Sequence, residues 1–317
     1  MLDVLKRFTP RWPAVLPFLL SPKARHKNDS SAASDTNWRH FDVELPPGLE
    51  IQWLGTAGFR LSYQGTDIVT DPYISRASFT DVARRRALLP LPERVERFIP
   101  RVDAVLVGHT HFDHAVDVPY LAERYGATIY GSRSMVNLLS IYGLAHKGVH
   151  VEHHKTYEIG PFEVTFVPSL HSKLVLGLQV PYEGELSCEH VEALTGPSYR
   201  CGQVYGIHIK VGGVTFYHQG SCNLIDDEVR HHGIDYFLAG IAGRGFTERY
   251  WTRILSRLEP RFVVPHHHDN FFLPVDEPMG FSFNVNYGSF VEEIRAVSSD
   301  FAIRSLDLLQ TVRGPER

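Results

Sequence analysis

His109, His111, Asp113 and His114 place four potential metal ligands within six residues of this chain. They directly follow an apolar run at 103–107, which predicts a strand buried on both faces. Alternate side chains of an extended segment point the same way, so the first two histidines can face one metal ion. The turn brings Asp113 and His114 toward a second ion. Imidazole and carboxylate groups are zinc ligands, so we predict a metal site at this strand end.

The composition is that of an ordinary soluble globular protein. Hydrophobic residues make up 43% and charged residues 21% of the 317 residues, and the net charge is −4. This balance gives no reason to expect nucleic acid as a partner. No run approaches the roughly 18–20 apolar residues of a membrane span. Cys188, Cys201 and Cys222 form no Cys-x-x-Cys pair, and their odd number favours a reducing compartment, the cytoplasm. A single bridge between the first two stays open.

The N-terminal segment 1–42 is predicted to be a tail and linker, partly disordered or associated with a surface. Residues 21–37 are small and polar, and so have little apolar surface to bury. The globular domain is expected at 43–317. A short apolar stretch behind basic residues faintly resembles a signal peptide. A weak peripheral membrane contact through Trp12 and Phe18 is a further alternative to a plain tail.

Short β-rich runs alternate with turn signals from residue 49 onward. The expected strands are Leu49–Leu54, Phe59–Tyr63, Asp67–Thr70, Asp103–Val107, Ala127–Tyr130, Phe162–Val167, Leu174–Val180, Val204–Lys210, Val214–His218, Tyr236–Leu238 and Phe262–Val264. The expected helices are 132–142, 247–258 with Thr247 as N-cap, and 288–297. We predict a layered α/β protein with two sheets inside and helices outside. Residues 182–202 interrupt the pattern and are interpreted as an inserted surface loop or lid.

His-x-His-x-Asp-His after an apolar strand resembles the signature of the metallo-β-lactamase-fold hydrolases, and the resemblance covers roughly residues 48–300. It implies a four-layer αββα sandwich. Asp71 matches an early strand-end aspartate that supports the site by hydrogen bonding. His171 matches the next metal histidine and completes a first site with His109 and His111. His267, two residues after Pro265, matches the last one, although three consecutive histidines leave that register open by one.

The chain departs from this family at one position. Ser221 stands where an aspartate normally bridges both metals, and a neutral hydroxyl is a poor zinc ligand. The second site then consists of Asp113, His114 and His267, or else it binds metal weakly and the enzyme is mononuclear. Cys222 lends a thiolate in one interpretation and is a small buried hydrophobe in the other. His218 is expected to support the site from behind or to be a plain strand residue.

The resemblance implies a hydrolase that uses metal-bound hydroxide to cleave an ester, lactone or phosphodiester bond. Asp113 would hold the nucleophilic water, and His268, Asp269 or His218 would supply a proton to the leaving group. The cofactor is expected to be one or two zinc ions, with manganese or iron as alternatives. Arg244 is interpreted either as a contact for an anionic substrate or as a solvated surface residue.

In motif detail the chain is most similar to the branch containing ascorbate-phosphate lactonases and N-acyl-phosphatidylethanolamine phospholipase D. The expected substrate is a small or lipid-like molecule, whose specificity would reside in loops such as 73–100 and 182–202. A β-lactamase or thioester hydrolase of the same fold is one alternative. A metal-binding protein without catalytic activity, suggested by Ser221, is another. The sequence does not fix the oligomeric state.

Overall fold

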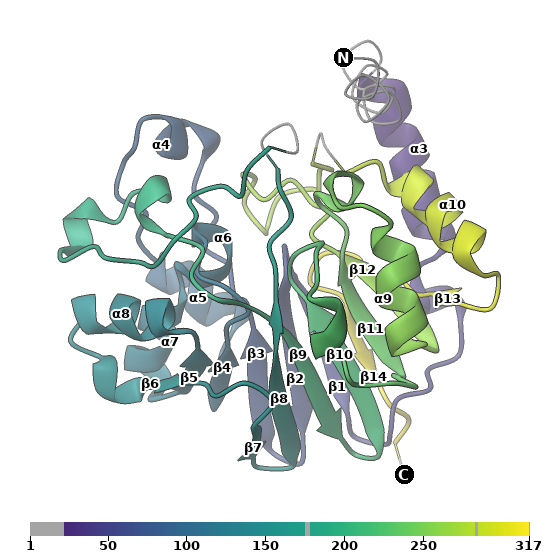
Figure 1. The fold of residues 1–317 in the computed structure, drawn as a ribbon, viewed down its shortest axis with the longest axis horizontal. Coiled ribbons are helices and arrows are strands. Elements are labelled where there is room, and N and C mark those ends of the chain that lie inside the picture. Colours follow the sequence, from purple (N-terminus) through teal and green to yellow (C-terminus); the bar gives the residue numbers. More distant parts are fainter. Residues whose placement is uncertain (1–21, 175–177, 283–284, 317) are drawn as a thin grey trace.

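Two mixed β-sheets packed face to face form the centre of the protein. The computed structural model describes residues 22–174, 178–282 and 285–316, and side chains from residue 26 onward. Within these residues each sheet has seven strands. Figure 1 shows the sheets nearly edge-on, with helices on both outer sides. The predicted four-layer αββα sandwich is confirmed.

The first sheet is built mainly from the N-terminal half of the chain. Its order is β14 (Thr311–Arg313), β1 (Glu50–Gly55), β2 (Gly58–Tyr63), β3 (Thr66–Thr70), β4 (Ala104–Leu106), β5 (Thr128–Gly131) and β6 (Gly148–His150). Strands β3 to β6 run parallel, whereas β1 pairs antiparallel with both β2 and β14.

The second sheet comes from the C-terminal half. Its order is β13 (Ala302–Ile303), β12 (Phe262–His266), β11 (Tyr236–Gly240), β10 (Val214–Gln219), β9 (Val204–Val211), β8 (Phe162–Ser169) and β7 (Thr156–Ile159). Strands β10 to β13 are parallel, and β9 runs against both of its neighbours.

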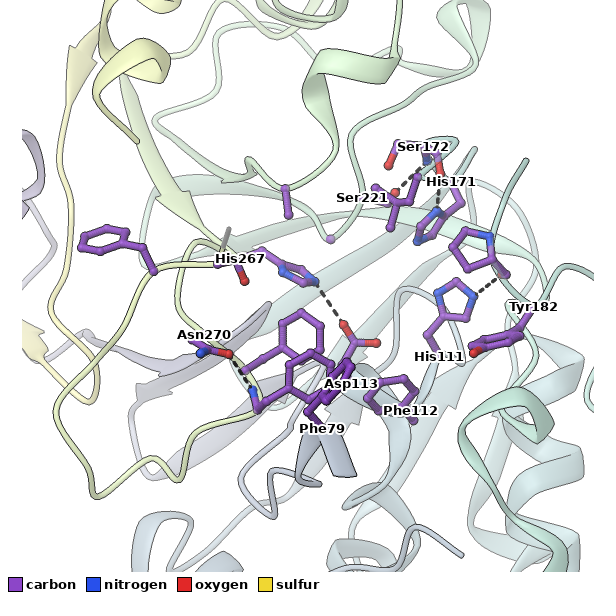
Figure 2. A pocket seen from close by; sticks show the side chains of 18 of the residues that line it. Phe79, His111, Phe112, Asp113, His171, Ser172, Tyr182, Ser221, His267 and Asn270 are labelled. Carbon is purple, nitrogen blue, oxygen red and sulfur yellow. Dashed lines mark hydrogen bonds and ion pairs between the residues drawn. The ribbon is translucent and has the colours of Figure 1, made fainter. Parts of the chain in front are cut away.

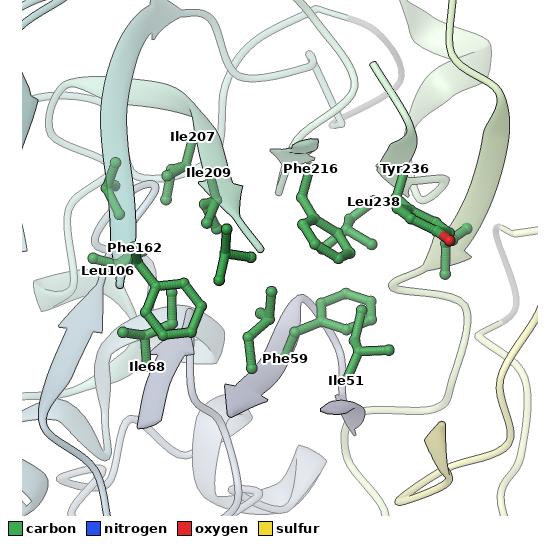
Figure 3. Packing of buried hydrophobic residues seen from close by; sticks show 14 of the residues in the cluster. Ile51, Phe59, Ile68, Leu106, Phe162, Ile207, Ile209, Phe216, Tyr236 and Leu238 are labelled. Carbon is green, nitrogen blue, oxygen red and sulfur yellow. The ribbon is translucent and has the colours of Figure 1, made fainter. Parts of the chain in front are cut away.

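Alternation along the strands explains how the sheets pack. In β3, Ile68 faces the layer between the sheets and Val69 faces the helices; Leu106 and Val105 of β4 divide in the same way. Such strands are apolar on both faces, which is why the run at 103–107 reads as continuously apolar. Figure 3 shows the layer between the sheets, where Ile68 and Leu106 lie near Phe162.

Helices cover the outer faces with apolar stripes. Over the first sheet lie α5 (Pro92–Phe98), α7 (Val118–Tyr125) and α8 (Arg133–Ile141). Over the second lie α9 (Tyr250–Leu258) and α10 (Tyr287–Val297). In α9 the residues at helical spacing, Trp251, Ile254, Leu255 and Leu258, are all buried, as the pattern predicts. Thr247 is not its N-cap, because the helix begins after Arg249, and the Thr247 hydroxyl instead donates to the Cys222 carbonyl.

The segment that we interpreted as a linker forms a helix, α3 (Pro22–Asp35), beside α10. The Gly288 backbone nitrogen donates to Oδ1 of Asp29 at 3.0 Å, and Ala33 packs on the same apolar cluster. Small residues allow close approach, so the helix is held without the apolar stripe that the prediction required. Packing continues through Trp38, which stacks on Tyr236 with ring centroids 5.4 Å apart. The packed part of the chain therefore begins before residue 43, the expected start of the globular domain. Trp12 and Phe18 lie outside the described residues.

The other expected strands are present, with small shifts at their ends. For Leu174–Val180, residues 175–177 lie outside the described part, and no named strand covers the rest. The interrupting segment 182–202 is a surface loop, but a packed one. Leu186, Leu194 and Tyr199 are buried against the cluster that underlies the helices of the first sheet. No helix in the described ranges combines the length and apolar character needed to cross a membrane.

Candidate metal centre

The predicted ligands follow the carboxyl ends of strands at one edge of the two sheets. Asp71 follows β3, His109 follows β4, and His171 follows β8. Ser221 and His267 follow β10 and β12. Because β3 and β4 run parallel, as do β10, β11 and β12, these ends meet at the same edge. Residues far apart in the sequence are thereby brought together, as is usual for sites at strand ends.

A four-residue helix divides the motif into two halves. His111 is extended and occupies the N-cap position of α6 (Phe112–Ala115), whereas Asp113 and His114 lie within the helix. The change of backbone direction turns the later pair away from the earlier one. Figure 2 shows the His111 and Asp113 side chains directed to different parts of the same pocket.

His109, His111 and His171 form a first triad whose ligand nitrogens all lie within 4.8 Å of one another. Nε2 of His109 is 3.1 Å from Nδ1 of His111. The His111 Nε2–H donates to the Pro181 carbonyl at 2.8 Å, and the His171 Nδ1–H donates to the Ser172 carbonyl at 2.7 Å. A carbonyl can only accept, so these bonds fix both tautomers and leave the opposite ring nitrogens free for a metal.

Asp113, His114 and His267 form a second triad of the same compactness. Oδ2 of Asp113 lies 3.2 Å from Nε2 of His267 and 3.7 Å from Nε2 of His114. The two triads adjoin, since the His109 and His114 ring centroids are 3.8 Å apart.

The first triad fits a tetrahedral metal such as zinc. Zn–N bonds of about 2.0–2.1 Å at tetrahedral angles place ligand nitrogens about 3.3 Å apart, close to the spacing of the His109 and His111 nitrogens. Burial lowers the pKa of His109 and His171 well below the ordinary value, and it lowers that of His111 to about 4. The neighbouring imidazoles act in the same direction on His109. At neutral pH all three rings are therefore uncharged, which is the form that binds metals.

The second triad carries opposite charges. Burial raises the pKa of Asp113, but His114 and His267 outweigh burial and hold that pKa well below its usual range. Burial lowers the pKa of His114, but Asp71 and Asp113 outweigh burial and raise it. The buried His114 ring lies between two carboxylates, so a positive charge is favoured there. A metal ion bound to the ring would supply that charge in place of the proton.

Asp71 lies behind this triad. Its Oδ2 is 3.0 Å from Nδ1 of His114, and its Oδ1 accepts from the Gly108 backbone nitrogen at 2.7 Å. A Cβ added at Gly220 would lie 2.8 Å from Asp71 Oδ2, so the chain needs glycine there. His218 lies behind Asp71 at 3.8 Å and donates from Nε2 to the Ala57 carbonyl at 2.8 Å.

A comparison with known families agrees with this geometry. The family model described as the beta-lactamase superfamily domain matches residues 50–267, more than half of the chain.

The chain belongs to the β-lactamase superfamily.

Together with the two-sheet fold, this match confirms the predicted metallo-β-lactamase-fold hydrolase superfamily. A UPF0173 metal-dependent hydrolase of Staphylococcus aureus is 28% identical over 248 residues, covering 76% of this chain and 94% of that protein.

Solved structures share the fold at low sequence identity. Igni18, a metallo hydrolase from Ignicoccus hospitalis, has a TM-score of 0.55 and 19% identity, covering 85% of this chain and 99% of that one. CmlA, a diiron β-hydroxylase from Streptomyces venezuelae, has a TM-score of 0.54 and 17% identity, covering 89% of this chain and 59% of its own. Structural similarity at this low identity shows the fold alone. The chemistry must therefore be inferred from the residues of this chain.

Of the three consecutive histidines, His267 is the one that the structure places in the second triad. His266 instead donates from Nε2 to the Leu238 carbonyl at 3.2 Å and stacks on His218. His267 has a φ of 59°, a costly left-handed conformation for a non-glycine residue. Its backbone nitrogen donates to the Thr56 carbonyl at 2.8 Å, which holds the conformation.

His268 and Asp269 do not join the site, which corrects their expected catalytic role. His268 is fully buried and stacks on Trp53, with ring centroids 4.5 Å apart. Asp269 lies 2.6 Å from the Arg76 guanidinium and accepts from the Thr56 backbone nitrogen at 2.9 Å. Neither residue lines the cavity. The backbone turn at His267 directs these neighbours into the protein, where they have structural contacts instead. His218 is likewise kept from the cavity by Asp71.

Arg244 is neither a substrate contact nor a surface residue. It is buried and donates to the Glu293 carboxylate at 2.7 Å and to the Ile241 carbonyl at 3.1 Å. It therefore ties the segment after β11 to α10.

Ser221 lines the cavity, and its hydroxyl accepts from the Ser172 backbone nitrogen at 3.0 Å. It thus braces the loop that carries His171. Cys222 is fully buried in the apolar cluster under α9, and its thiol donates to the Gly240 carbonyl at 2.8 Å. The thiolate alternative is wrong, because this side chain is directed into the core and not toward the triads.

The three cysteines are free, so the open Cys188–Cys201 bridge is not formed. Cys201 and Cys222 are buried, whereas Cys188 is partly exposed. Burial raises the pKa of the Cys201 thiol to about 12. We expect a thiol-specific reagent to label Cys188 rapidly in the native protein and the other two only after denaturation. Peptide mapping of the labelled protein measures this, and fast native labelling of Cys222 would contradict its placement.

Both triads border a cavity of about 550 Å³, within the range typical of small-molecule sites, which is lined by His111, His171, Asp113 and His267. Besides predicted ligands, its wall contains aromatic residues that the sequence analysis did not single out: Phe79, Phe112, Tyr182, Phe271, Phe272 and Phe281. Arg76, the partner of Asp269, was likewise not predicted. The adjacent Phe271 and Phe272, which follow the histidine run after Asp269 and Asn270, were an available signal for the wall.

Proposed function

We propose that the protein is a metal-dependent hydrolase with two metal ions, zinc by preference, that cleaves an ester, lactone or phosphodiester bond. The observation that carries the proposal is the pair of adjoining triads that border one cavity. The name of the Staphylococcus aureus relative, a metal-dependent hydrolase, supports it. The substrate is a small or lipid-like molecule, and the cytoplasm is the proposed location.

The chain's own residues define the roles. His109, His111 and His171 would hold the first ion, and Asp113, His114 and His267 the second. Zinc, when bound, lowers the pKa of water and polarises a substrate oxygen. Oδ2 of Asp113 contacts both histidines of its triad, which leaves Oδ1 to accept a hydrogen bond from water in the cavity and orient it.

Among the described residues no carboxylate bridges the two triads, and Ser221 stands where the superfamily normally has one. We propose that the charge of Asp71 behind His114 compensates in part. It stabilises positive charge at the second triad through the imidazole, as carboxylate partners of metal-bound histidines do.

Metal content and generic hydrolysis together test the proposal. The protein is purified, its metals are counted by elemental analysis, and hydrolysis of para-nitrophenyl esters and bis(para-nitrophenyl) phosphate is followed. Metal-dependent hydrolysis that a chelator abolishes and zinc restores supports the function. A fully loaded protein that is inert to the whole panel would favour a non-catalytic metal-binding protein.

Asp113→Ala is expected to lower kcat by on the order of 100-fold or more, because it removes both a ligand and the group that orients water. The first triad does not involve Asp113, so this variant should retain one bound ion per chain. Turnover and metal content measured on the same sample check both statements. Asp300→Ala, at an exposed position far along the chain, is the matched control. Near-normal turnover in Asp113→Ala would refute the assigned role.

A further inference from the structure

A ladder of aromatic rings leads from the second triad to the surface. The rings of His267 and Phe271 are 5.8 Å apart, those of Phe271 and Phe272 4.5 Å, and those of Phe272 and Phe79 5.5 Å. Phe79 is 67% exposed at the outer end. Figure 2 shows Phe79 and Phe112 on the same side of the pocket as Asp113. An apolar substrate group beside the second triad would therefore contact rings along its whole length.

Hydrogen bonds fix the segments that carry this ladder. Asn270 Oδ1 accepts from the Phe272 backbone nitrogen at 3.3 Å, and the Asn270 nitrogen donates to the Gly280 carbonyl at 2.6 Å. On the other side, buried Asp117 accepts from the Ser75 backbone nitrogen at 3.0 Å and so anchors the loop that leads to Phe79. A wall held in this way binds an apolar group without a large ordering cost.

The described part of the cavity wall offers no cationic side chain to an anion. Among the described residues that line it, the only ionisable groups besides Tyr182 are Asp113 and the histidines His111, His171 and His267. Arg76, which is close to Phe79 in the sequence, is buried and forms an ion pair with Asp269. Lys173 is exposed but is not among the lining residues. A negative charge on the part of the substrate that lies along these rings, away from the triads, would have no cationic side chain beside it, which is unfavourable.

We infer that the substrate carries an uncharged apolar group, such as the acyl chain of an open or cyclic carboxylic ester, which lies against Phe271, Phe272 and Phe79. This inference rests on the proposed hydrolase function and narrows it to substrates with such a group. In the reaction, water adds to the carbonyl carbon and the acyl carbon–oxygen bond breaks. One proton of the water goes to the departing alcohol oxygen, and the hydroxyl stays on the acid.

Matched substrates test the charge and the apolar contact separately. Para-nitrophenyl butyrate and para-nitrophenyl hemisuccinate have acyl chains of equal length and differ in charge. We expect the zinc-loaded protein to have a kcat/KM at least about tenfold higher for the butyrate. Extension from acetate to octanoate should raise kcat/KM by about tenfold or more, because methylene groups become buried. Equal rates on the charged and neutral esters would overturn the inference while leaving a hydrolase in place.

Variants and a binding measurement separate this inference from the hydrolase function. Phe272→Ala should reduce the preference for octanoate to about threefold or less, whereas Phe41→Ala, outside the cavity, should preserve it. Alkyl para-nitrophenyl ethers have no hydrolysable bond, and calorimetry gives their Kd for the metal-free protein. The hexyl ether should bind about tenfold more tightly than the methyl ether, and Phe272→Ala should abolish the difference. Equal affinity of the two ethers would contradict the apolar wall even if hydrolysis is observed. Chain-length-dependent binding without any hydrolysis would contradict the proposed function alone.

Discussion

Replacement of Asp269 by asparagine is expected to remove the second metal ion and to lower the free energy of unfolding by about 3–5 kcal/mol. The Asp269 and Arg76 side chains are each 1% exposed, and their charged groups lie 2.6 Å apart. An asparagine would leave the guanidinium buried without a counter-charge, and its NH₂ group cannot accept a hydrogen bond from it. The expected decrease in the free energy of unfolding is therefore that of a broken buried ion pair.

The effect reaches the metal through Thr56. The Thr56 backbone nitrogen donates to Asp269 at 2.9 Å, and its carbonyl accepts from the His267 nitrogen at 2.8 Å. Thr56 and His267 both have positive φ angles, 49° and 59°, so neither conformation is maintained without support. When Asp269 no longer holds the turn, His267 is free to leave its left-handed conformation, and the second triad loses a ligand. The first triad has no link to this turn and should keep its ion.

Elemental analysis and urea unfolding of Asp269→Asn measure the two effects. Asp276→Asn is the matched control, because Asp276 pairs with Arg97 at the surface, where their side chains are 35% and 66% exposed. An exposed pair contributes about 1 kcal/mol or less, so this variant should resemble the parent protein in both measurements. Two ions per chain in Asp269→Asn would show that His267 holds its position without the Arg76–Asp269 pair.

Much of the site was predictable because ligand identity and strand ends are both local properties of the sequence. His109 and His171 each follow an apolar run, and the spacing of Asp113 and His114 is that of one short turn. Strand β4 of the first sheet was predictable for the same reason, since its residues are apolar on both faces. The order of the later histidines was not predictable. Which of His266, His267 and His268 faces the metals depends on a single left-handed residue held by a carbonyl more than two hundred positions away.

Features that depend on contacts between segments distant in the sequence could not be predicted from it. Nothing near Arg76 indicates that it meets Asp269, because the contact joins the segment after β3 to the segment after β12. The helix α3 lacks an apolar stripe, and its position depends on the close approach of Gly288 to the Asp29 carboxylate. The aromatic wall likewise combines Phe79 with Phe271 and Phe272. Composition and periodicity describe each segment alone and do not register such contacts.

The metal-free protein is expected to lose stability steeply as the pH falls from about 6.5 toward 4. Burial is the largest cause that lowers the pKa of many histidines in the folded chain. They are His109, His111, His171, His208, His218, His231, His266 and His268. The values are about 4 for His111 and His268 and about 3 for His208. Only neutral rings fit these positions, so acidification favours the unfolded chain.

The sign follows from proton counting. Histidines of the unfolded chain titrate near about 6.5, so between that pH and the folded pKa values the unfolded chain binds more protons. The free energy of unfolding therefore decreases as the pH falls through this window. His111 and His268 each contribute about 3 kcal/mol over the full window. His114 acts in the opposite direction, because its pKa is raised, but it is one group against many. The sum reaches the total stability of an ordinary domain, about 5–15 kcal/mol.

Urea unfolding in chelator at several pH values between 7.5 and 5 measures this loss. His208→Phe is an informative variant, because His208 stacks on His231 away from the triads, with ring centroids 3.9 Å apart, and phenylalanine preserves a stacking ring. It should flatten the pH dependence in part without changing metal content. A free energy of unfolding that stays constant from pH 7.5 to 5 would contradict the burial of neutral rings. Zinc should shift the loss to lower pH, because an ion on His109, His111 and His171 competes with protons for the same nitrogens. The contribution of His208 to the pH dependence should not shift with zinc. This difference would distinguish histidines that bind metal from those that are only buried.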